Sequence, residues 1–230
     1  MDTVRAMQAI VSWKVVSAKS TWLFDLNELN PRGKAIFPEL LEWLEEEYHF
    51  EKAPKSTTDL DDTKAQLFSQ GSFQVREEIF VGVELRVYTD GLIATTWSST
   101  RDTDAFLSDV LTSAAVEFNL AYEPDTVRRK MCLSELHVKC LKELSGMNPK
   151  LLDFAEKIKT LLPGHAQVPF EPAGLMIAPV QGVSPFTIAA FRFERKNGTA
   201  PDEHKYYSVA PLHTDDHLDL LNFIEKDLMI

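Results

Sequence analysis

The stretch that decides the fold runs from Val81 to Trp97 and reads VGVELRVYTDGLIATTW. Apolar and polar residues alternate through its first half, which is the period of a strand with one buried face. Asp90-Gly91 then supplies a tight-turn pair before a second run of strand-forming residues. We therefore expect a β-hairpin here, and an antiparallel sheet around it.

Shorter segments with the same alternation lie on both sides of this hairpin. A strand is expected just before it, and the last third of the chain contains three more apolar runs of strand length. Two longer segments of mixed character are expected to supply a leading strand to each half of the chain. These predicted strands lie at 73–76, 175–178, 187–193 and 206–209, with the leading strands drawn from 9–26 and 131–144.

Four other segments have apolar residues at helical spacing. The first is expected to begin beside Pro38, because proline is well suited to the first turn of a helix. Asp102-Thr103-Asp104 and Thr214-Asp215-Asp216 supply the side-chain oxygens and negative charge that favour a helix start. The predicted helices cover 37–48, 102–118, 149–162 and 214–228.

The order strand, helix, three strands, helix occurs twice, which predicts an internal duplication. We expect one repeat at 1–122, with a mobile loop near 51–66, and a second at 123–230. Thr103-Asp104 and Thr214-Asp215 are the matching helix starts. Strands joined by hairpins and grouped between helices predict an α+β fold, with an antiparallel sheet and helices on one face.

This plan resembles, in outline, TATA-binding-protein-like duplicated domains and acidic secretion-chaperone-like units built as α-β-β-β-α. The resemblance rests on the order of the elements alone. Because no motif in the sequence is specific to either family, it implies an architecture and no function.

The charge of the chain is lopsided. The 230 residues include 24 Lys and Arg against 35 Asp and Glu, for a net charge of −11, and 44% are hydrophobic, which is enough for a packed core. The first repeat holds 20 of the acidic residues and only 11 of the basic ones. A solvated surface is the ordinary explanation of acidic runs, and a docking site for a basic partner is the functional one. The candidate partner-binding residues are Glu45, Glu46, Glu47, Asp59, Asp61 and Asp62.

The cysteines and the apolar stretches bear on the cellular setting. Cys132 and Cys140 form neither a disulfide framework nor a zinc-binding pair, so we expect reduced thiols. No apolar leader segment is visible at the start, and no apolar stretch is long enough to span a membrane. The sequence therefore predicts a cytoplasmic protein without a cofactor.

The densest group of reactive side chains is His213-Thr214-Asp215-Asp216-His217. Two histidines four residues apart can share a helical face, so His213, Asp215 and His217 are the candidate metal ligands. Capping of a helix by Thr214 and the aspartates is the simpler interpretation.

Three functions follow from these features. We favour a non-catalytic protein-protein interaction protein, such as an adaptor, chaperone or inhibitor, because no catalytic motif is present. The first alternative is a metal-dependent hydrolase or nucleic-acid-processing enzyme that uses the His213–His217 region. Direct nucleic-acid binding is disfavoured by the net charge and by the short basic triplet Arg128-Arg129-Lys130. The second alternative is ligand or nucleic-acid binding on the sheet face through Tyr88, Trp97, Phe191, Phe193, Tyr206 and Tyr207.

Overall fold

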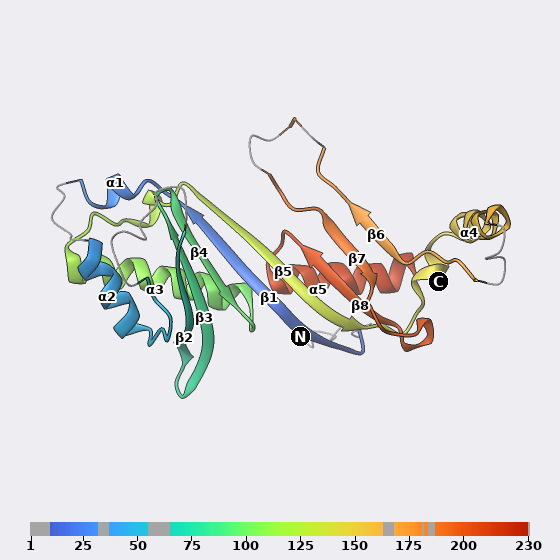
Figure 1. Cartoon of the computed structure of the whole chain (residues 1–230), viewed down its shortest axis with the longest axis horizontal. Coiled ribbons are helices and arrows are strands. Elements are labelled where there is room, and N and C mark those ends of the chain that lie inside the picture. The colour runs from blue at the N-terminus through green and yellow to red at the C-terminus, as the bar shows by residue number, and fades with distance from the viewer. Residues whose placement is uncertain are drawn as a thin grey trace, which may run out of the picture. The chain divides into compact units, whose positions relative to one another are not determined.

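The computed structural model of the chain describes residues 10–31, 37–54, 65–162, 168–180, 182–183 and 187–229. Its elements follow the predicted order, a strand, helical segments, three strands and a helix, and then that order again (Figure 1). The first series is β1 (Ser12–Leu23), α1 (Leu26–Leu29), α2 (Phe37–Glu47), β2 (Gln66–Arg76), β3 (Ile79–Tyr88), β4 (Gly91–Thr96) and α3 (Thr100–Phe118). The second is β5 (Arg129–Lys139), α4 (Pro149–Leu161), β6 (Gly174–Ile177), β7 (Phe191–Arg195), β8 (Lys205–Ala210) and α5 (Thr214–Phe223), which a π-helical turn at Ile224–Leu228 continues.

In the described part of the chain, the strands form one open antiparallel sheet of eight strands in the order β2-β3-β4-β1-β5-β8-β7-β6. The predicted α+β class is therefore confirmed, while the internal duplication remains a prediction. Within the described residues, no helix is both long and apolar enough to cross a membrane.

The chain divides into two compact units. We call residues 17–134 with 212–214 the acidic unit, and residues 1–16, 135–211 and 215–230 the near-neutral unit. The acidic unit contains 21 acidic and 12 basic residues, whereas the near-neutral unit contains 14 and 12. The boundary expected between residues 122 and 123 falls inside the acidic unit. The excess of negative charge expected in the first half of the chain is therefore also found when the charges are counted by compact unit.

The predicted hairpin at 81–97 is confirmed as strands β3 and β4, which pair from Val83 opposite Thr96 to Tyr88 opposite Gly91. Buried residues alternate in β3 at Val83, Leu85 and Val87, whereas every residue of β4 except Ile93 is buried. They face α3, which lies along this side of the strands (Figure 1). The period of two in the sequence therefore gives a sheet with one face covered by a helix.

Aromatic side chains fill the core of the acidic unit. Phe106 of α3 is completely buried and meets the ring of Tyr48 edge to face, with 5.0 Å between ring centroids. Phe73 of β2 also packs against Phe106, with 5.3 Å between ring centroids. Leu41 and Leu44 bring the apolar face of α2 into the same cluster. The acidic residues of α2 are left on its outer face.

Several element boundaries differ from the predicted ones. Strand β2 is longer than the predicted 73–76. Its first part was not predicted, because the irregular register between Phe68 and Gly71 interrupts the alternation of apolar and polar residues. Strand β7 begins at Phe191, later than the predicted 187. Of the loop expected near 51–66, residues 55–64 lie outside the described residues, Lys52 bridges to Ser69, and Gln66 belongs to β2.

Gly91 is required by the close approach of the neighbouring strand. A Cβ at this position would lie 2.2 Å from the backbone carbonyl oxygen of Trp22 and 3.1 Å from Cα of Leu23. We expect Gly91→Ala to lower the free energy of unfolding by about 2 kcal/mol, since backbone must move to relieve the overlap. Urea unfolding measures this effect. Gly82→Ala is the control, because its Cβ would meet only the Trp97 ring at 3.4 Å, and equal losses in both variants would contradict the argument.

Candidate functional site

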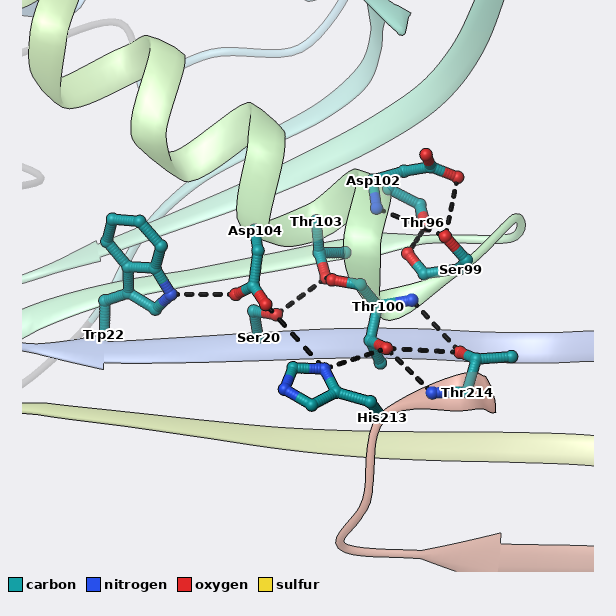
Figure 2. A network of polar contacts seen from close by, with 10 residues as sticks. All are labelled: Ser20, Trp22, Thr96, Ser99, Thr100, Asp102, Thr103, Asp104, His213 and Thr214. Carbon is teal, nitrogen blue, oxygen red and sulfur yellow. Dashed lines mark hydrogen bonds and ion pairs between the residues drawn. The ribbon is translucent and has the colours of Figure 1, made fainter. Parts of the chain in front are cut away.

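A network of polar side chains surrounds the start of α3 (Figure 2). Ser99 is the N-cap: its hydroxyl oxygen accepts a hydrogen bond from the backbone N–H of Asp102 at 3.2 Å, and its hydroxyl donates to the Asp102 carboxylate at 2.9 Å. The helix therefore begins at Thr100, two residues before the predicted start at Asp102. Ser99 uses the capping chemistry that the sequence assigned to Asp102.

The first residues of α3 and α5 cap each other. The N–H of Thr100 donates to Oγ1 of Thr214 at 3.1 Å, and the N–H of Thr214 donates to Oγ1 of Thr100 at 2.9 Å. The two hydroxyl oxygens are 3.3 Å apart, and both side chains are buried. Both helices thus begin with a threonine, and α3 begins at Thr100 and not, as the sequence suggested, at Thr103.

Buried polar pairs extend this network along α3. Thr103 donates its hydroxyl to the carbonyl oxygen of Thr100 at 2.9 Å, and its oxygen lies 2.7 Å from the hydroxyl of Ser20 on β1. The indole N–H of Trp22 donates to Asp104 at 2.9 Å (Figure 2). These contacts satisfy polar groups that would otherwise be costly to bury, so the network holds α3 on the sheet.

His213 does not form a catalytic triad with its neighbours, although its ring lies beside a hydroxyl and a carboxylate. Its Nδ1 lies 3.3 Å from Oγ1 of Thr100 and 3.8 Å from Asp104. A general base in a triad takes a proton on one ring nitrogen while the other donates to the carboxylate, but both contacts here use the same nitrogen. Thr100 is also completely buried, out of reach of a substrate.

The predicted metal ligands have separate surroundings. His213 precedes α5 and contacts Thr100, Asp215 is exposed, and His217 is completely buried with Nε2 2.8 Å from Oγ of Ser208. Among the described residues, no three His, Cys, Asp or Glu side chains are grouped so that they could hold a metal ion. The geometry therefore gives the metal site and the hydrolase hypothesis no support.

The predicted partner-binding residues on α2 are accessible. Glu45, Glu46 and Glu47 are exposed in the last turn of the helix, which contains no basic residue, whereas Asp59, Asp61 and Asp62 lie outside the described residues. Negative charge at a helix C-terminus opposes the helix dipole. In the part of the chain that the structure describes, no basic side chain forms an ion pair with these glutamates.

A further acidic group lies beside this end of α2. The phenol of the buried Tyr48 donates a hydrogen bond to the carboxylate of Asp109 on α3 at 2.8 Å. Burial raises the pKa of Tyr48, and the neighbouring Asp109 and Glu47 raise it further. Tyr48 therefore stays neutral, and its hydrogen bond holds the Asp109 carboxylate of α3 near the last turn of α2.

The basic triplet has internal partners. Arg128 pairs with Glu28, and the ammonium group of Lys130 lies 3.6 Å from the centre of the Trp22 ring. Arg129 also has an interaction partner. Arg128 and Lys130 therefore have partners within the acidic unit.

The aromatic residues proposed for the sheet-face alternative divide between core and surface. Phe193 and Tyr206 are buried and stack on each other at 4.7 Å, and Phe191 packs against His217. Trp97 is 54% exposed, while Tyr207 donates its hydroxyl to Glu135 at 2.5 Å. Phe193 and Tyr206 are therefore core residues, whereas Trp97 is a surface residue.

Sequence reasoning missed a buried carboxylate in the near-neutral unit. Glu225 is 1% exposed and accepts hydrogen bonds from the backbone N–H groups of Leu141 and Lys142. Burial raises the pKa of the neighbouring Cys140 thiol, and Glu225 raises it further. Its burial could have been predicted from the helical spacing, because Glu225 follows the buried Leu221 by one helical turn. The buried Cys140 thiol is therefore protonated, and no disulfide joins Cys132 and Cys140.

Comparison with known proteins assigns no role to these residues. No protein-family model matches the chain, and no curated protein is significantly similar to it. The class of the protein is therefore the one its own structure gives, an α+β protein with an open eight-stranded antiparallel sheet.

Proposed function

We propose that this protein is a non-catalytic binding protein that engages a basic protein partner through its acidic unit. The observation that carries the proposal is the outer face of α2, where Glu45, Glu46 and Glu47 are exposed and without ion pairs among the described residues. Such an arrangement opposes the helix dipole and therefore does not serve the stability of α2. Concentrated negative charge accelerates and orients the docking of a positively charged partner.

Two further features support binding over catalysis. His213 contacts Thr100 and Asp104 through one nitrogen, which is not the arrangement of a general base. The threonine, serine and aspartate side chains around it are occupied in capping α3 and in fixing it to β1. An adaptor, chaperone or inhibitor needs a stable scaffold with a charged docking surface, and these contacts supply the scaffold.

The test measures binding of a fluorescent oligolysine peptide by anisotropy at low and high ionic strength. The variant Glu45→Gln/Glu46→Gln/Glu47→Gln is expected to bind about tenfold more weakly than the wild type at low ionic strength. The control Glu117→Gln/Asp125→Asn/Glu194→Gln removes the same charge from exposed positions elsewhere and is expected to change affinity much less. Equal losses in the two variants, or wild-type binding that salt does not weaken, would contradict α2 as the docking element.

A further inference from the structure

Helix α4 presents an unusual stripe to solvent. Lys150, Phe154, Lys157 and Leu161 follow one another at spacings of four, three and four residues, so they lie on one face of the helix. All four are exposed, Phe154 at 61% and Leu161 at 69%. Only Ala155 of α4 is buried, and the helix stands clear of β6, β7 and β8 in Figure 1. We call these four residues the α4 stripe.

The α4 stripe combines two exposed apolar side chains with two free positive charges. Lys150 and Lys157 form no ion pair with a described side chain, whereas the neighbouring Lys159 is paired with Glu156. An apolar surface of this kind on a single chain marks an interaction site. Its complement is an apolar surface that carries negative charge.

The tip of the β2–β3 hairpin has that complementary chemistry. The two-residue turn Glu77-Glu78 is followed by Ile79 and Phe80, which are 50% and 62% exposed. Both glutamates are exposed and form no ion pair with a described residue, and Arg76 before them leaves the tip with an excess of one negative charge. Glu78 also has a positive φ of 61°, a conformation that glycine or asparagine adopts more readily.

We infer that the α4 stripe of one copy of this chain binds the β2–β3 hairpin tip of a second copy. Phe154 and Leu161 would pack against Ile79 and Phe80, with the two lysines facing the two glutamates. Both surfaces are exposed to solvent. The contact joins two different surfaces, so it builds either a closed pair or a longer head-to-tail assembly. It does not involve the glutamates of α2.

The test is sedimentation velocity of the full-length chain over a range of concentrations at low ionic strength. The wild type is expected to self-associate, and the α4 variant Lys150→Glu/Lys157→Glu and the tip variant Glu77→Lys/Glu78→Lys are each expected to associate about tenfold more weakly. Mixing the two variants restores opposite charges across the contact and is expected to recover association. All four positions are exposed, so thermal unfolding verifies that both variants are folded.

The control Lys139→Glu/Lys226→Glu reverses two exposed lysines of the same unit outside α4 and is expected to associate like the wild type. A wild type that is monomeric throughout, an equal loss in the control, or a mixture that stays monomeric would overturn the inference. Wild-type chains that bind phosphatidylserine vesicles without self-association would assign the stripe to a lipid surface and also overturn it. Each of these results is independent of the oligolysine measurement on α2.

Discussion

Thr100→Val is expected to lower the free energy of unfolding by about 3 kcal/mol, a large effect for an isosteric change. The substitution removes the acceptor of the Thr214 N–H and the partner of the Thr214 hydroxyl, and both groups are buried. An unpaired buried N–H costs about 1–3 kcal/mol, and a lost cap costs about 1 kcal/mol. Urea unfolding of the purified variant measures the loss.

A double-mutant cycle with Thr214→Val shows whether the two caps act together. Each single variant loses one capped N–H and the same hydroxyl pair, so the double variant is expected to lose about 1 kcal/mol less than the sum. Thr100→Ser keeps the hydroxyl and is expected to restore most of the stability. Thr112→Val is the control, since Thr112 is exposed on the same helix. A Thr100→Val chain that unfolds like the wild type would show that the reciprocal caps do not stabilise the fold.

The reciprocal caps mark the limit of what the sequence predicts about this site. Ser99, Thr100 and Asp102 are all good capping residues, so local chemistry places a helix start here without choosing among them. The choice depends on Thr214, which is 114 residues away in the chain. A contact of that sequence separation leaves no periodic signal, so the sequence placed the start of this helix at Asp102-Thr103 and not at Thr100.

The strands show the same division between local and long-range information. The β3–β4 hairpin was predictable, because the alternation is unbroken and Asp90-Gly91 fixes the turn. The first half of β2 was not, since Gln70 has a positive φ of 60° and the register shifts around it. Such an irregularity moves apolar residues out of the period of two, so only the end of the strand was recognised.

The candidate metal ligands failed to meet for a geometric reason. The rule that residues four apart share a face applies only inside a helix, and His213 lies before the first residue of α5. His217 lies within α5 and points into the core against Ser208 and Phe191. The spacing of apolar residues in this helix does not predict that His217 is a core residue, because its neighbours Asp216 and Asp219 are typical of an exposed helix start.

The buried His217 is expected to make the stability of the protein depend on pH between about 6.5 and about 4. The Ser208 hydroxyl donates to the carbonyl oxygen of Arg192 at 2.8 Å, so it must accept a hydrogen bond from Nε2–H of His217. Nδ1 is then the unprotonated nitrogen, and it is buried without a partner. Protonation there would create a buried cation with no acceptor, and burial accordingly lowers the pKa of His217 to about 4.

The direction of the effect follows from proton binding. Between these two pH values the unfolded chain binds a proton at His217 and the folded chain does not, so acid favours unfolding. The stabilisation is complete above pH 6.5 and is lost as the pH falls towards 4, with a total of about 3 kcal/mol. The carboxylates titrate in the same range, so the measurement is the difference in unfolding free energy between wild type and His217→Gln at each pH.

Glutamine can still donate to Ser208 but does not titrate, so this difference isolates His217. The difference is expected to shrink steadily as the pH is lowered. A ring titration of His217 by NMR gives an independent value. An NMR titration midpoint near 6.5, together with a pH-independent difference in unfolding free energy between wild type and His217→Gln, would contradict this argument. It would mean that water or an acceptor reaches Nδ1 of His217.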